Sequence, residues 1–212
     1  MKPKPFHILV LTAALTACDE PVLFTEPQPQ DKSSLAQFPE RWQGSYLSEG
    51  DSSLLEIGPH IIRVLRDWTL RDPLSAMDGT VQLRGDTVIE FGPGITAPVT
   101  VRNDSIFGTL HITDSLFAIG DHGILKRMSG NLFLNRSDNG SSWEVTQLTL
   151  SGGRLRINKV RDPASLAAIK EVIELPGDTI SAPLSITRKQ FRGIIRHGGF
   201  QVSDEYIRVR SK

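Results

Sequence analysis

Short apolar runs recur between residues 41 and 160, and clusters of Gly, Asp, Asn and Ser separate them. Their spacing is about ten residues, and no helical periodicity intervenes. Such spacing is typical of an antiparallel meander that closes as a barrel or packs as a sandwich. We therefore predict a mainly β fold. The expected strands are residues 54–57, 61–65, 87–91, 99–101, 105–110, 115–119, 124–128, 131–135, 143–150 and 155–160.

Two dipeptides mark hairpin turns within this meander. Asn139-Gly140 is a common sequence for a type I′ turn, which needs positive φ at both central residues. Gly152-Gly153 marks a second turn, because glycine adopts positive φ without steric cost.

After residue 160 the pattern becomes helical. Asp162 can cap a helix that starts at Pro163. Thr187 and Gln190 have the spacing of a capping box, which predicts a second helix from that point. Residues 205–210 then resemble a closing strand. We expect residues 161–212 to form a small helix-helix-strand extension packed on a β domain over 39–160.

The N-terminus combines a short basic stretch, an apolar run over residues 8–15 and the only cysteine, Cys18. The run is far shorter than the roughly 20 residues that span a bilayer, so it indicates a signal peptide. Leu15-Thr16-Ala17-Cys18 resembles the lipobox of bacterial lipoproteins, which are cleaved before a cysteine that carries acyl chains. The resemblance implies a signal peptide over 1–17 and lipidation of Cys18. An ordinary secretory signal with an unrelated cysteine is the alternative.

Cysteine usage and charge exclude several functions. With Cys18 lipidated, the mature chain has no thiol for a disulfide, a nucleophile or a zinc site. The full chain balances 24 basic against 24 acidic residues. Because nucleic-acid binding requires a basic surface, we expect no nucleic-acid partner.

Residues 19–38 are rich in proline, glutamine and acidic residues, without helical or strand periodicity. We therefore expect the lipidated cysteine and a flexible tether over 18–38. Asp19-Glu20 resembles an inner-membrane retention signal of some bacteria and a surface-export signal of others. We expect a cell-envelope location and favour the outer membrane over the inner. The periplasmic and surface faces both remain open.

The order of lipobox, acidic tether, meander, helices and final strand resembles uncharacterised β-rich lipoproteins of Gram-negative bacteria. Trp42-Gln43-Gly44 also resembles the aromatic-glycine opening of lipocalin-like barrels. The lipocalin resemblance implies a small apolar ligand in a barrel cavity. The lipoprotein resemblance implies no particular activity, so an envelope protein is equally a candidate partner.

The sequence contains no familiar catalytic motif. No two histidines have the spacing of zinc ligands on a helix, and we expect no metal and no cofactor. We assign no catalytic residue. The alternative is an envelope hydrolase whose site forms between distant strands. It would require convergence of at least two residues among Glu90, His111, Asp121 and His122.

A basic face is predicted on the second helix. Arg188, Arg192 and Arg196 recur every four residues, so they share one side of the helix. This face could contact anionic lipid headgroups, lipopolysaccharide or an acidic partner protein. A solvated helix face explains the same pattern.

Four Asp-Ser or Asp-Thr pairs precede an aliphatic residue. The element resembles an O-glycosylation acceptor motif of exported proteins in one group of Gram-negative bacteria. An Asx turn that enters a strand explains the same sequence, and both interpretations can hold. The acceptors implied by the resemblance are Thr87, Ser105, Ser115 and Thr179.

Together these features predict a lipid-anchored cell-envelope protein. Its expected role is that of a binding or structural module, attached to the membrane through the N-terminal lipid.

Replacement of Cys18 tests the anchor. We expect Cys18→Ala to release the protein from the membrane fraction, because no other segment is long and apolar enough to hold it there. Fractionation after expression in a Gram-negative host measures this release. A variant that remains membrane-bound and is processed like the wild type contradicts the lipobox interpretation.

Overall fold

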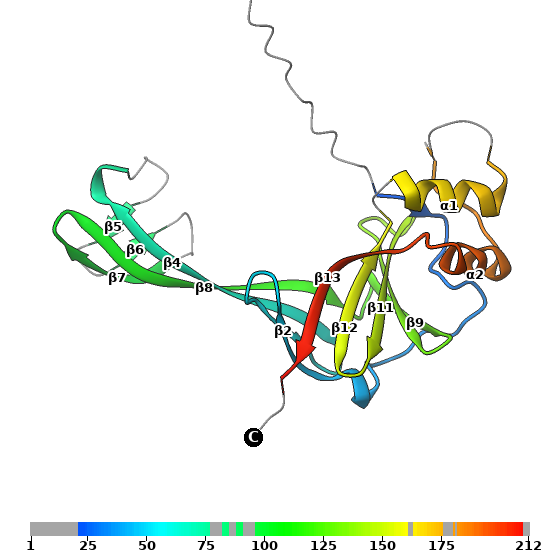
Figure 1. The fold of residues 1–212 in the computed structure, drawn as a ribbon, viewed down its shortest axis with the longest axis horizontal. Helices are drawn as coiled ribbons and strands as arrows, with labels where there is room; N and C mark the ends of the chain where they lie inside the picture. The colour runs from blue at the N-terminus through cyan, green and yellow to red at the C-terminus, as the bar shows by residue number, and fades with distance from the viewer. Residues whose placement is uncertain are drawn as a thin grey trace, which may run out of the picture.

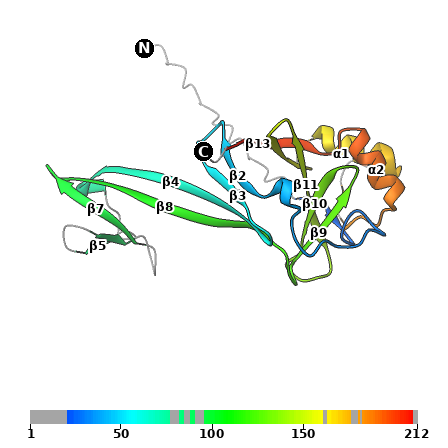
Figure 2. The same ribbon diagram turned by 90° about the horizontal axis from the view of Figure 1, so that it is seen from below.

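The computed structural model describes residues 21–76, 82–84, 88–90, 96–160, 163–175, 180 and 182–209. In these residues the protein is mainly β, with antiparallel strands and two α-helices near the C-terminus. This confirms the predicted fold class. Figures 1 and 2 show a body that carries both helices and a long arm that leaves the body on the opposite side.

Thirteen strands are joined by antiparallel pairing in the order β5-β6-β7-β8-β4-β3-β2-β13-β12-β11-β10-β9, with β1 beside β11. The strands are β1 (Leu23–Phe24), β2 (Gly44–Ser48), β3 (Leu54–Ile57), β4 (Ile61–Pro73), β5 (Gln82–Arg84), β6 (Val88–Glu90), β7 (Thr96–Arg102), β8 (Ser105–Ala118), β9 (Gly123–Met128), β10 (Asn131–Arg136), β11 (Trp143–Ser151), β12 (Arg154–Lys159) and β13 (Gln201–Arg208). The helices are α1 (Pro163–Ile173) and α2 (Arg188–Arg196), and two short 3-10 helices are η1 (Glu40–Trp42) and η2 (Leu74–Ala76). Within the described residues the sheet does not close into a barrel.

The arm is built on the two longest strands, β4 and β8, which have 13 and 14 residues and pair along their whole length. β4 also pairs with β3 as far as Leu65, and β7 pairs with β8 from Gly108 outward. We call β4 and β8 beyond Leu65, together with β5, β6 and β7, the arm. Between Arg66 and Thr69 it is only two strands wide, and we call this part the waist.

The sequence predicted two strands where β8 is continuous. Asp114-Ser115 was expected to be a turn between residues 105–110 and 115–119, and this is wrong. Asp114 lies opposite Val64 in the ladder, and its carboxylate accepts a hydrogen bond from Arg66 at 2.8 Å. Pairing with β4 therefore carries the strand through a sequence that favours a turn.

The body has two hydrophobic cores, and β10 contributes to both. Leu132 and Leu134 point into the first core, whereas Phe133 points into the second. The first core is enclosed by the curved sheet. The second lies between β9, β10 and β11 and the two helices. A strand buried on both faces has a continuous apolar sequence, as residues 132–134 do.

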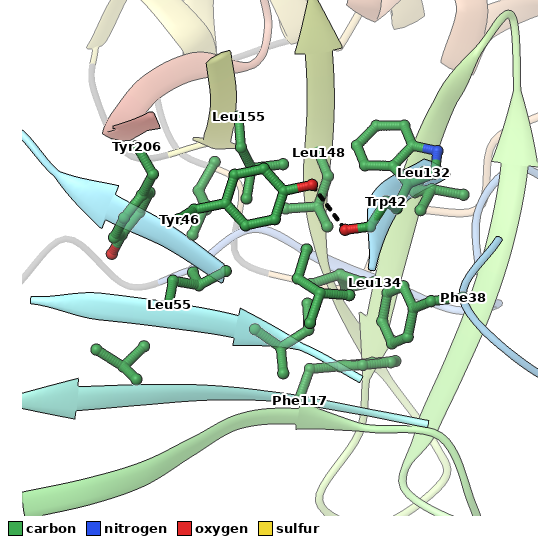
Figure 3. Packing of buried hydrophobic residues seen from close by; sticks show 14 of the residues in the cluster. Phe38, Trp42, Tyr46, Leu55, Phe117, Leu132, Leu134, Leu148, Leu155 and Tyr206 are labelled. Carbon is green, nitrogen blue, oxygen red and sulfur yellow. Dashed lines mark hydrogen bonds between the residues drawn. The ribbon is translucent and has the colours of Figure 1, made fainter. Parts of the chain in front are cut away.

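The first core is filled by large side chains at its centre (Figure 3). Trp42 and Tyr46 are fully buried there, and the Tyr46 hydroxyl donates to the Trp42 carbonyl oxygen at 2.7 Å. Burial raises the pKa of Tyr46, while the nearby Arg208 guanidinium opposes the rise. The small apolar ligand expected from the lipocalin resemblance stays a prediction.

The flexible tether expected over 18–38 is wrong for residues 21–38, which we call the N-terminal strap. Val22 and Phe24 are buried in the second core, and Phe38 is buried in the first. The strap also contributes β1, which pairs with β11. Its proline-rich composition concealed these isolated apolar side chains.

The expected division at residue 160 does not follow the sheet. The predicted closing strand is present as β13, but it lies between β2 and β12 in the middle of the sheet. Residues 161–212 are therefore part of one structural unit with residues 39–160. The helices of this segment do pack on the β strands, through Ile169, Phe191 and Ile194 in the second core.

Both predicted hairpins form, with different turns. Ser151 pairs with Arg154, so Gly152 and Gly153 make a two-residue turn with φ of 57° and 80°. These positive values fit a type I′ turn. The Asn139-Gly140 hairpin has a longer loop, because Arg136 pairs with Glu144. Gly140 alone of that dipeptide has positive φ, so the expected type I′ turn is wrong there.

Because Phe24 of the strap is fully buried, its substitution should lower stability strongly. We expect Phe24→Ala to lower the free energy of unfolding by about 3–5 kcal/mol, since it removes a fully buried ring from the second core. Phe107→Ala is the control, because that ring is 37% exposed on the arm; it should cost less than about 1 kcal/mol. Urea denaturation of the purified proteins gives both values. Equal effects would mean that the strap is not part of the core.

Candidate membrane-facing surface

The basic face of α2 forms as the sequence predicts. Gln190 donates its backbone N–H to the Thr187 hydroxyl at 3.3 Å, and Thr187 donates its backbone N–H to the Gln190 side chain at 2.9 Å. This capping box fixes the start of the helix. The buried side of α2 carries Phe191 and Ile194. The exposed side therefore carries Arg188, Arg192 and Arg196.

Arg192 also borders an open hollow of about 490 Å³ beside α2. Two further cations line it, Lys32 from the strap and Arg127 from the end of β9. We call this site the basic hollow. Its complete lining is Lys32, Ser33, Leu35, Arg127, Met128, Ser129, Gly130 and Arg192.

The strap is fixed in place by backbone pairing and by one buried side chain. Leu35 donates its backbone N–H to the Leu125 carbonyl oxygen at 2.7 Å, on the free edge of β9. The Asn135 amide accepts from the Gln28 backbone N–H at 2.5 Å and donates to the Gln28 carbonyl oxygen at 2.8 Å. The Asn135 side chain thus makes the two backbone hydrogen bonds that a neighbouring strand would otherwise make with Gln28. These contacts place Lys32 opposite β9.

The hairpin between β9 and β10 forms the second wall. Met128 pairs with Asn131, so Ser129 and Gly130 make a two-residue turn with φ of 52° and 84°. Arg41 donates to the Gly130 carbonyl oxygen at 2.8 Å. The same guanidinium lies 5.5 Å from the centre of the Trp42 ring, a cation–π distance. The turn is therefore tied to the first core.

The basic hollow has excess positive charge. Among the described residues, no carboxylate forms an ion pair with Lys32, Arg127 or Arg192. Burial lowers the pKa of a neighbouring cation, Lys126, while Glu26 and Asp31 of the strap oppose that shift. The Lys126 ammonium donates to two strap carbonyl oxygens, at 2.9 and 3.1 Å. The acidic groups of the strap therefore act on Lys126.

The chain enters the fold against the buried side of α2, and β11 and β10 separate β1 from β9 and the basic hollow. The ring centres of Phe24 and Phe191 are 6.2 Å apart, so the strap packs directly against α2. Leu184, just before α2, pairs with Phe24 as well. Only Asp19 and Glu20 separate Cys18 from the strap.

The residues proposed for a hydrolase are not brought together. His111 lies in the waist, where its Nδ1 is 2.7 Å from an Asp67 carboxylate oxygen, and both side chains are exposed. Asp121 and His122 lie in the turn beyond β8, and the strand from His111 to Ala118 spans roughly 20 Å at about 3.3 Å per residue. Glu90 lies on β6, at the far end of the arm.

The part of the chain that the structure describes contains no group of three or more His, Cys, Asp or Glu residues that could hold a metal ion. The alternative of an envelope hydrolase stays a prediction.

The four candidate glycan acceptors have different positions. Ser105 follows a two-residue turn at Asn103-Asp104, and Ser115 is exposed within β8. Thr87 and Thr179 lie outside the described residues. Glycosylation of these residues stays a prediction.

Comparison with known proteins found no family model, no curated protein and no solved structure that matches this chain. In the described residues, neither helix has the length and apolar character needed to cross a bilayer. The argument for function therefore depends on the geometry of the basic surface and the arm.

Sequence analysis identified Arg192 but not its two partners. Lys32 lies in the segment that the sequence predicted to be a tether. Arg127 lies at the end of a strand, about 60 residues before α2 in the sequence. No local pattern links residues so far apart in the chain. The alternation in residues 123–128 could have placed Arg127 on an exposed side, without showing what faces it.

Because Asn135 binds the Gln28 backbone, its substitution should destabilise the strap locally. We expect Asn135→Ala to lower the local stability of the strap by about 1–3 kcal/mol, because the buried Gln28 N–H and carbonyl oxygen lose their partners. Faster amide hydrogen exchange at Gln28 measures this change. Asn139→Ala removes comparable hydrogen bonds from an exposed turn and should leave the strap protected. Unchanged exchange in Asn135→Ala contradicts the role of Asn135.

Proposed function

We propose that this chain is a lipid-anchored cell-envelope protein that acts as a binding module. Its body rests on the membrane surface with α2 and the basic hollow towards the headgroups. The arm extends away from the membrane and is available to another envelope component. We favour the outer membrane, and either face of it is compatible with the proposal.

The entry of the chain into the fold is the observation that carries this proposal. Because Val22 is buried, lipidated Cys18 would be linked to the body by a very short segment. A body held this closely cannot move freely above the bilayer. The strap packs against the buried side of α2, and the exposed side of that helix carries three arginines. Cations near an anionic membrane surface each contribute about 1 kcal/mol to binding.

The arm has the features of a contact element. It leaves the body on the side opposite the helices in both views (Figures 1 and 2). At about 3.4 Å per residue, β4 and β8 are about 45 Å long. Trp68 in the waist is 58% exposed, although it lies on the same face of β4 as the buried Leu70. A partner protein could cover this ring.

Distance to the membrane tests the orientation. Lipidated Cys18 leaves no other thiol, so a single cysteine can be introduced and labelled with a fluorophore. We expect strong energy transfer to a membrane-bound acceptor from Lys189→Cys on α2 and weak transfer from Thr100→Cys on the arm. Both side chains are exposed, which makes the variants comparable. Equal transfer from the two positions in the anchored protein contradicts the proposal.

A further inference from the structure

We propose that the basic hollow is a binding site for the phosphate group of an anionic membrane lipid. Its location at the membrane rests on the function proposed above. The site itself is defined by Lys32, Arg127 and Arg192, which line the same hollow from three separate elements.

The three cations suit a phosphate ligand. Guanidinium groups can donate two parallel hydrogen bonds to phosphate oxygens, and Arg127 and Arg192 supply two such groups. Lys32 adds an ammonium that rotates to the remaining oxygen. Since these heads have no carboxylate partner in the described residues, a bound anion would not have to displace an existing ion pair.

The hollow is also amphipathic. Met128, which is 5% exposed, and the half-buried Leu35 belong to the two cores and form its apolar part. Ser33 and Ser129 also line the hollow. A lipid headgroup with its glycerol presents both phosphate oxygens and carbon atoms.

Attachment to the membrane favours a headgroup over other anions. A ligand presented on the same surface as the anchor has an effective concentration in the millimolar range, so weak contacts suffice for occupancy. An acidic protein would need a larger complementary surface. We therefore assign the site to a lipid of the same membrane.

The test uses the full chain with Cys18→Ala, which cannot be lipidated. Its partition onto vesicles of phosphatidylcholine containing phosphatidic acid is compared with that of a Lys32→Gln/Arg127→Gln/Arg192→Gln variant. We expect the triple variant to bind these vesicles roughly tenfold more weakly or worse, since each cation contributes at the surface. On pure phosphatidylcholine, which has no net charge, the two proteins should bind equally weakly.

A matched control removes the same charge elsewhere. Arg63→Gln/Arg71→Gln/Arg102→Gln changes three exposed arginines on the outer side of β4 and on the arm. It should bind like the parent chain. An equal loss in this control would show attraction by net charge alone and would overturn the site. Retained binding by the first variant would overturn it as well.

Two further measurements identify the ligand. Lys32→Arg/Arg127→Lys/Arg192→Lys keeps the charge but removes both original bidentate groups, so it should bind more weakly than the parent chain and more tightly than the glutamine variant. Binding equal to that of the parent chain would show attraction by charge alone and would overturn the site. Inorganic phosphate at millimolar concentration should not displace the protein from the vesicles beyond the effect of matched ionic strength. Displacement by phosphate would indicate a site for the free ion and would overturn the assignment to a lipid. The Cys18→Ala chain carries no lipid, so a negative vesicle result would overturn only the phosphate site. The energy-transfer experiment on the anchored protein tests the proposed function separately.

Discussion

Burial of both faces of β9, β10 and β11 is the constraint on which the rest of the body depends. Leu132 and Leu134 require a cover on one side, and Phe133 requires another on the opposite side. The sheet covers the first face by curving around Trp42 and Tyr46. The second face is covered by the two helices and the N-terminal strap. The basic hollow forms where strap, hairpin and α2 meet at the rim of that second core.

This arrangement gives the strap a role in stability and in position. Phe24 contacts Phe191 edge to face, and Asn135 holds Gln28 where no strand is present. Residues close to the proposed lipid therefore contribute to the same core as the helix with the basic face. A flexible tether would separate anchor and binding surface. The buried strap holds them in one fixed relation instead.

Local patterns predicted what local interactions determine. The strand at Leu54–Ile57, the capping box at Thr187 and the outward arginines of α2 were all expected from the sequence. The strap was not expected, because the short run Val22-Leu23-Phe24 and the single Leu35 and Phe38 lie among prolines and polar residues without a period. The continuity of β8 was not expected either, because pairing with β4 overrides the turn preference of Asp114-Ser115. The basic hollow was missed for the same reason, since tertiary contacts bring Lys32 to Arg127.

The central position of β13 has a consequence for the order of assembly. β13 pairs with β2, a strand near the other end of the chain, and separates it from β12. A chain that emerges N-terminus first therefore presents β2 and β12 with unpaired edges until β13 has been synthesised. Long-range pairing of this kind is slow and leaves the chain extended meanwhile. Loss of β13 would divide the sheet in its middle. Loss of an edge strand such as β9 would only shorten the sheet from one side.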